Sequence, residues 1–324
     1  MQTLPGTPTS ENALIPQLDI CKPSIIALYR PGRISGENIP TFQNVKKVQK
    51  QTSLKDDYAR RSSMQRIGII AGSGFYETEG GAVKELRKLT TPYGEPSDVY
   101  RVCDLSGQEV VFLSRHGVPH HIPPHRINYC ANIWGFRELG VERILSVNAV
   151  GGISRHLEPG DIVIADQIVD MTYGRASTFY NENEVVHIDF TEPFCPELRT
   201  SVITAGKRIS TKIVNSGTYV CVNGPRLETD AEIRAFSTFG ADIVGMTVMP
   251  EACLARELEL CFACIALVTN YAAGISEREL TATEVVETMQ FSRERIRNLI
   301  SESLVEVPGS RICNCKNALR EAKI

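Results

Sequence analysis

The sequence predicts a single α/β domain in which helices flank a central sheet. Short runs that are almost continuously apolar recur from Ile67 onward, and amphipathic helical patterns separate them. Such runs are typical of central strands buried on both faces. Regular alternation of strands and helices indicates one α/β layer structure. The sequence contains no visible internal repeat.

The elements can be assigned in chain order from these patterns. Apolar runs predict strands at residues 67–71, 110–114, 144–150, 162–165, 243–247 and 264–269. Ile127, Cys130, Ala131 and Trp134 recur with helical spacing and mark one face of a helix. The amphipathic segment 283–305 predicts a long C-terminal helix.

The predicted domain occupies residues 64–308. Residues 1–63 are rich in Pro, Ser, Thr and Gln and lack a helical or strand period, which predicts a disordered extension. Met64 directly precedes the first strand and is an alternative start of the protein. Residues 309–324 form a short tail that contains Cys313 and Cys315.

Composition excludes several classes of partner. The chain is 42% hydrophobic and 23% charged, and its formal net charge is −3, which is typical of a globular protein. This charge gives no basis for binding nucleic acid or an anionic membrane. No apolar run approaches the ~18 residues of a membrane span, and the N-terminus lacks a signal-peptide pattern. We therefore expect a cytoplasmic protein.

The ten cysteines do not form the spacing pattern of a disulfide scaffold in a chain of 324 residues. Cys221, Cys261 and Cys264 lie in apolar runs, where a free thiol behaves as a small hydrophobe. Cys313-Asn314-Cys315 leaves three interpretations open: a redox pair, half of a metal site, or a coincidence of composition. We favour coincidence, because no matching Cys or His spacing accompanies the motif.

Glycine-rich strand ends suggest contacts with an anion. Ala71-Gly-Ser-Gly74 follows the first strand, where the backbone can approach a ligand and Ser73 can donate to it. Glu77 occupies the third glycine position of a dinucleotide fingerprint, so that fingerprint is absent. Gly-Ser-Gly is also a common turn. Ser146 to Gly152 is a second strand that runs into a glycine turn.

Ser114-Arg115-His116-Gly117 places a cation and an imidazole after a buried strand, where α/β sheets bind ligands. The guanidinium fork suits phosphate oxygens. The alternative is a surface salt bridge with a capping histidine. His116, His120, His121 and His125 do not predict a metal site, because the prolines between them indicate an extended loop.

Three further segments can contact a sugar and a base. Met246 can pack under a sugar ring, or in the core, and Thr247 can donate to phosphate. Glu228, within Gly224-Pro-Arg-Leu-Glu-Thr229, and Asn270 supply a carboxylate and an amide that can frame the edge of a flat heterocycle. The alternative for Glu228 is a structural ion pair with Arg226 or Arg234.

Taken together, these motifs resemble the purine nucleoside phosphorylase family, in the branch that contains methylthioadenosine phosphorylase. The resemblance runs from Ile67 to Val307 and includes Asn128-Tyr129, Ala131-Asn-Ile-Trp134, Pro159-Gly-Asp161 and Pro250-Glu251. It implies a single-domain nucleoside phosphorylase fold with a central mixed sheet, a homotrimer, and metal-free phosphorolysis. Inorganic phosphate is then a co-substrate, and no cofactor is expected.

The resemblance also implies roles for individual residues. The implied phosphate site consists of Ser73, Arg115, His116, Asn148, Ala149 and Thr247. The implied nucleoside site consists of Met246 under the ribose, Glu228 and Asn270 at the base, and Leu227, Tyr271 and Ala272 beside them. The implied catalytic residues are Asn270, Glu228 and His116.

The base pocket departs from methylthioadenosine phosphorylase, which has an aspartate at the position of Asn270 and a second acid two residues later, where this chain has Ala272. Glu228 with Asn270 is the pairing of relatives that cleave inosine and guanosine. An ionised Glu228 accepts from N1–H of a 6-oxopurine but faces the N1 lone pair of adenine. Ala282 replaces a histidine of relatives specific for a 5′-hydroxyl, which suggests room for a methylthio group.

We therefore expect phosphorolysis of inosine, guanosine or methylthioinosine in purine salvage. The first alternative is a methylthioadenosine phosphorylase with an unusual pocket. A second is a non-catalytic nucleoside-binding protein, which the complete anion set argues against. A nucleosidase that uses water would have little need of a phosphate site.

Overall fold

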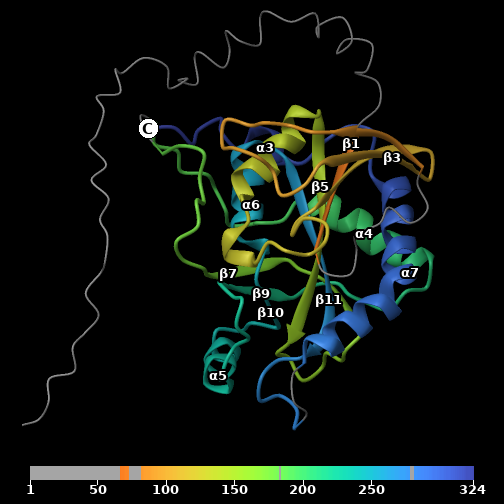
Figure 1. Cartoon of the computed structure of the whole chain (residues 1–324), viewed down its shortest axis with the longest axis vertical. Helices are drawn as coiled ribbons and strands as arrows, with labels where there is room; N and C mark the ends of the chain where they lie inside the picture. Colours follow the sequence, from red (N-terminus) through yellow and green to blue (C-terminus); the bar gives the residue numbers. More distant parts are fainter. Residues whose placement is uncertain (1–65, 73–81, 182–183, 278–280) are drawn as a thin grey trace, which may run out of the picture. The chain divides into compact units, whose positions relative to one another are not determined.

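The computed structural model describes residues 66–72, 82–181, 184–277 and 281–324 (Figure 1). The predicted extension 1–63 and Ser73 lie outside the described residues. The strands are β1 (Arg66–Ala71), β2 (Val83–Arg87), β3 (Tyr100–Leu105), β4 (Gln108–Ser114), β5 (Val141–Gly152), β6 (Ile162–Ile164), β7 (Gln167–Met171), β8 (Ile213–Val214), β9 (Thr218–Val222), β10 (Ile243–Gly245) and β11 (Cys261–Tyr271). The helices are η1 (Pro124–Arg126), α3 (Tyr129–Glu138), α4 (Pro196–Arg208), α5 (Asp230–Thr238), α6 (Val248–Glu257), α7 (Ala282–Glu306) and η2 (Asn314–Asn317).

The strands form one mixed sheet, as expected. Its main path is β2-β3-β4-β1-β5-β10-β9-β7, and β11 pairs with both β5 and β6. β1 runs parallel to β4 and β5, and β5 runs parallel to β11, whereas β10 is antiparallel to β5. The carboxyl ends of β1, β4, β5 and β11 therefore lie along the same edge, where ligands of α/β sheets bind.

Helices cover the sheet on both faces. α4 and α7 lie together on one side of the central strands, and α3 and α6 lie on the other (Figure 1). The main core cluster joins α4 and α7 to β1, β4, β5 and β11, and it includes Leu198, Val202, Ile296 and Leu299. This packing fixes the central strands from which the site residues extend.

Most of the predicted elements are confirmed. The six predicted strands correspond to β1, β4, β5, β6, β10 and β11, and both predicted helices are present as α3 and α7. One strand end was wrong: β10 stops at Gly245, and Met246 and Thr247 lie in the turn that leads into α6. The short or exposed strands β2, β3, β7, β8 and β9 were not predicted, because they lack a long apolar run.

The C-terminal residues 309–324 pack onto the domain. Cys313 and Cys315 belong to the main core cluster, and Val186 forms a β-bridge with Lys323. Cys221 and Cys264 are buried within the fold, as expected of small hydrophobes. That interpretation is incomplete for Cys261, whose Sγ lies 3.3 Å from the Sγ of Cys313.

The helices within the described ranges include none that is both long enough and apolar enough to cross a membrane.

Candidate active site

The carboxyl ends of β1 and β4 bring three residues around one point. Ala71 pairs with Ser114 at the ends of these strands, and the Arg115 N–H donates to the Ala71 carbonyl at 2.9 Å. A Cβ atom at Gly72 would lie 3.0 Å from Arg115 Nη1 and 3.4 Å from His116 Nε2. Gly72 therefore leaves its backbone close to the guanidinium and the imidazole, as an anion-binding turn requires.

Arg115 forms a buried ion pair with Glu251 of α6. Its Nε donates to Glu251 Oε1 at 2.5 Å and its Nη2 to Oε2 at 3.1 Å. Both side chains are at most 1% exposed. The alternative of a surface salt bridge is therefore wrong. Glu251 fixes the guanidinium in the bidentate geometry that gives such pairs their directional specificity.

His116 is held as a neutral imidazole. Its Nδ1 donates to the Ile122 carbonyl at 2.8 Å, since a carbonyl oxygen can only accept. Burial, followed by the charge of Arg115, lowers the pKa of His116 to about 3. In the neutral tautomer, Nε2 is an acceptor on the Gly72 side of the ring. It suits the hydroxyl of a partly protonated phosphate.

Asn148 points an unused donor into the same region. Its Oδ1 accepts from Arg115 Nη2 at 3.1 Å and from Ser146 Oγ at 2.8 Å, which fixes the orientation of the amide. Among the described residues, its buried Nδ2 has no hydrogen-bond partner. An unsatisfied buried N–H group is costly, so this donor is available to a ligand or a water oxygen.

Thr247 and Met246 follow β10. Thr247 is buried, and its hydroxyl makes no capping bond to α6, although it occupies the N-cap position. Met246 is half-buried. A Cβ atom at Gly224 would meet Met246 Sδ at 2.4 Å, and Gly224 has a φ of 59° that favours glycine. Gly224 thus brings the Glu228 segment against Met246.

Glu228 is half-buried, and burial raises the pKa of its carboxyl group. The two arginines that could neutralise it have other partners. Arg226 pairs with Glu232, with Nη2 to Oε1 at 2.6 Å, and Arg234 pairs with Asp230. Within the described part of the chain Glu228 makes no salt bridge, so the alternative of a structural ion pair is wrong. Its carboxylate is left for a ligand.

Asn270 lies where β11 departs from regular pairing with β5. The register shifts between Val268 and Asn270, and such a bulge re-aims side chains. Asn270 Oδ1 accepts from Thr269 Oγ1 at 2.8 Å, and Nδ2 donates to the Tyr271 carbonyl at 2.9 Å. An amide can make four hydrogen bonds, so Asn270 keeps one donor and one acceptor for a ligand.

Close contacts connect these segments. A Cβ atom at Gly151 would lie 3.4 Å from Asn270 Nδ2. A Cβ atom at Gly274 would lie 2.2 Å from Asp230 Oδ1, which joins the loop after β11 to the segment after Glu228. The structure therefore brings the ends of β1, β4, β5, β10 and β11 together at one site, although β10 runs antiparallel to β5.

The remaining expected residues are placed as follows. Ala149 and Tyr271 are half-buried, and Leu227 is 44% exposed. Ala272 is buried in a second core cluster with Ile233 and Val244. Ala282 is the first residue of α7. His120 stacks on His116 with ring centroids 4.1 Å apart, and His121 Nδ1 donates to the Pro119 carbonyl.

Arg175 is a positioning residue that the sequence did not indicate. Its guanidinium donates to the carbonyls of Met246 at 2.8 Å, Met249 at 2.5 Å and Asn223 at 2.9 Å. It therefore fastens the turn after β10 to the segment that leads to Glu228. No strand end or glycine motif marks Arg175, so only its contacts reveal this role.

Comparison with known proteins identifies the family. Residues 66–305 match the Phosphorylase superfamily. This chain belongs to that superfamily. A probable S-methyl-5′-thioinosine phosphorylase of Thermodesulfovibrio yellowstonii is 53% identical over 79% of this chain and 97% of the relative. A 6-oxopurine nucleoside phosphorylase of Pyrococcus furiosus is 50% identical over 80% of this chain and 99% of the relative.

The fold comparison agrees with this assignment. A methylthioadenosine phosphorylase of Schistosoma mansoni, solved in complex with adenine, superposes with a TM-score of 0.76. It is 33% identical and covers 79% of this chain and 96% of its own. The match to the Phosphorylase superfamily, together with two sequence relatives that are named as nucleoside phosphorylases, shows that the chain is an enzyme of this type.

Proposed function

We propose that this phosphorylase cleaves 6-oxopurine nucleosides with inorganic phosphate, releasing the purine base and a ribose 1-phosphate or its 5-methylthio analogue. The observation that carries this proposal is the hydrogen-bonding capacity left at the base end of the site. Glu228 offers a carboxylate without a salt-bridge partner in the described residues, and Asn270 keeps one donor and one acceptor. This set matches N1–H, O6 and a protonated N7 of hypoxanthine or guanine.

In this proposal, phosphate lies beside Gly72, where Arg115 supplies positive charge, the neutral His116 accepts a hydrogen bond from a phosphate hydroxyl through Nε2, and Asn148 Nδ2 donates one. Ser73, Ala149 and Thr247 complete the phosphate site. As the C1′–N9 bond breaks, its electrons move onto the purine and the ribose becomes oxocarbenium-like. Phosphate oxygen then bonds to C1′. The side chains contribute by positioning and electrostatics.

Asn270 and Glu228 stabilise the departing purine, and Met246 packs against the ribose. Leu227, Tyr271, Ala272 and Ala282 border the nucleoside in the proposed site. We further propose a cytoplasmic homotrimer that needs no cofactor and takes part in purine salvage. Analytical ultracentrifugation of the full chain tests the trimer.

Purine release tests the function. The substrates are inosine, guanosine, methylthioinosine, adenosine and methylthioadenosine, each with and without phosphate. We expect phosphate-dependent release from the 6-oxo compounds and little from the 6-amino compounds. Preference for methylthioadenosine would contradict the proposed base pocket. Release that does not depend on phosphate would indicate a nucleosidase, and no release would indicate a binding protein.

A further inference from the structure

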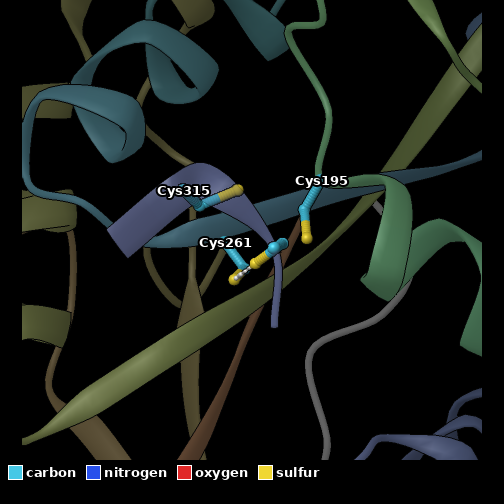
Figure 2. A group of neighbouring side chains, drawn as sticks. Cys195, Cys261 and Cys315 are labelled. Carbon is cyan, nitrogen blue, oxygen red and sulfur yellow. Dashed lines mark hydrogen bonds between the residues drawn. The ribbon is translucent and has the colours of Figure 1, made fainter. Parts of the chain in front are cut away.

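Four cysteines from three separate parts of the chain meet in what we call the thiol cluster: Cys195, Cys261, Cys313 and Cys315. Cys195 precedes α4, Cys261 begins β11, and the other two lie at η2. Their Sγ atoms all lie within 4.8 Å of one another, and all four residues are buried. Figure 2 shows that the labelled side chains of Cys195, Cys261 and Cys315 approach one another from separate elements.

The spacing of the sulfurs fits a tetrahedral metal site. With Zn–S bonds of about 2.3 Å, the sulfurs of a regular tetrahedron lie about 3.8 Å apart. The Sγ atoms of Cys261 and Cys313 are 3.3 Å apart and no pair in the cluster is more than 4.8 Å apart, so the spacing is compatible with this value. A disulfide would join two sulfurs at about 2.0 Å and would not require a third or fourth thiol at the same point.

The backbone around Cys195 supplies a hydrogen-bond donor to its sulfur. Cys195 is the N-cap residue of α4, and its Sγ accepts a hydrogen bond from the Leu198 N–H at 3.4 Å. The N-terminus of a helix favours nearby negative charge, which a metal-bound sulfur carries. Several thiolates in a buried cluster nevertheless repel one another, and a divalent cation removes that repulsion.

The cluster lies far from the proposed active site. Cys261 begins β11, whereas Asn270 lies near the end of the same strand. Nine positions of extended chain span about 30 Å. A cation held by four cysteines would also have no open coordination position, as in structural rather than catalytic zinc sites.

We propose that Cys195, Cys261, Cys313 and Cys315 bind one Zn²⁺ ion, which ties the C-terminal residues 309–324 to α4 and β11. Each thiol releases its proton to solvent as its sulfur binds the metal, and no group changes oxidation state. The ion would hold the segment after Pro308 against the core. The CxC motif is then half of a metal site, and the other half comes from Cys195 and Cys261.

Metal analysis of the full chain tests this proposal. The protein is purified without chelators under reducing conditions, and its zinc content is measured by inductively coupled plasma mass spectrometry. We expect about one zinc ion per chain in the wild type and at least about a tenfold loss in Cys315→Ser and Cys195→Ser. The matched control is Cys103→Ser, because Cys103 is a buried thiol outside the cluster, and it should keep its zinc.

A second measurement does not depend on the folding of any variant. Zinc is removed from the wild type with a chelator, and Co²⁺ is added under reducing conditions. Binding should produce the visible absorption of tetrahedral Co²⁺ with thiolate charge transfer, and added Zn²⁺ should abolish it. Three results would each overturn the proposal. The wild-type protein could contain no zinc and also fail to bind Co²⁺, or its intact mass could show that the purified protein has formed disulfides. The third such result is that Cys315→Ser retains all of its zinc.

Discussion

Arg115 shows how single residues build the site. Its guanidinium is fully buried and is held by Glu251, Ser146 and Asn148. A buried charge is tolerated when it is paired and hydrogen-bonded, and these contacts also fix its direction. Among the described residues, Asn148 Nδ2 beside this guanidinium has no hydrogen-bond partner, and Glu228, in a separate segment, makes no salt bridge. Asn148 and Glu228, whose polar groups lack these partners among the described residues, are the ones that we assign to substrate binding.

The first residue-scale prediction concerns Glu251. Glu251→Gln removes the carboxylate but keeps the side-chain shape, so it leaves the charge of Arg115 buried and unpaired. We expect a loss of about 3–5 kcal/mol in the free energy of unfolding and a raised KM for phosphate. Urea denaturation and phosphate kinetics measure these effects.

The matched control is Glu232→Gln, because Glu232 pairs with Arg226 at the surface. Its unfolding free energy should change by less than about 1 kcal/mol. If both variants lost the same unfolding free energy, burial of the Arg115–Glu251 pair would not explain the loss.

The second prediction concerns base preference. Asn270→Asp replaces an amide by an acid that can accept from the N6 amino group of adenine. We expect the ratio of kcat/KM for adenosine to that for inosine to rise by at least about tenfold. Steady-state kinetics with both nucleosides measure the ratio. An unchanged ratio would show that Asn270 does not read the base.

The third prediction concerns His116 and pH. Its folded pKa of about 3 lies below the ordinary histidine value of about 6.5, so the unfolded chain binds the extra proton between these pH values. Stability is therefore lost as pH falls from 6.5 towards 3. When pH falls from 7 to 5, the unfolding free energy of His116→Asn should increase by up to about 2 kcal/mol relative to that of the wild type. Denaturant titrations at both pH values measure this difference, and exposed His156→Asn should follow the wild type.

At the scale of elements, parallel pairing of the central strands places the site. β1, β4, β5 and β11 end along one edge. The turns after β1 and β4 carry Gly72 and Arg115, and the carboxyl halves of β5 and β11 carry Asn148 and Asn270. These turns depend on rigid strands beneath them. Contacts that pack α3 against β1 should therefore affect the positions of the residues along this edge.

Gly68 provides an element-scale prediction. A Cβ atom there would lie 2.8 Å from Phe136 of α3 and 3.0 Å from Val141 of β5. Gly68→Ala should therefore overpack this contact and lower the unfolding free energy by about 1–3 kcal/mol. Chemical denaturation measures the change. Gly309→Ala is the control, because no described atom lies within 4 Å of its added Cβ, and it should stay within about 0.5 kcal/mol of wild type.

At the scale of the domain, the C-terminal residues complete the core. Cys313, Cys315 and Ala322 are buried, and Arg311 donates to the Glu259 carbonyl at 2.7 Å. These contacts join residues 309–324 to the loop before β11. The segment therefore contributes to the stability of the domain that bears the active site.

Truncation after Pro308 tests this contribution. Loss of the buried side chains should lower the unfolding free energy by roughly 2–4 kcal/mol, and more if the bound metal is lost with them. Thermal and urea denaturation measure it. Deletion of Ile324 alone, which is 91% exposed, should have little effect. A truncated protein as stable as the full chain would show that the segment is a dispensable tail.

The sequence by itself determined the α/β class, the central strands and the residues at their ends. Apolar runs identify strands buried on both faces, and the Ser-Arg-His-Gly and Gly-Pro-Arg motifs identify polar turns, because both signals are local. Because these signals are local, they did not predict every element correctly. The exposed strands β2 and β7 lack an apolar run, and the apolar residues near Gly245 do not show that β10 ends there and that the chain turns into α6.

Only the tertiary structure decided which distant residues are partners. It placed Glu251 against Arg115, 136 positions away, and gave Arg226 to Glu232 rather than to Glu228. It also brought Cys195 and Cys261 to the CxC motif. The Arg115–Glu251 contact and the thiol cluster join segments that are remote in sequence. The fold of the sheet and the packing of its helices create them, and neither composition nor local periodicity encodes that information.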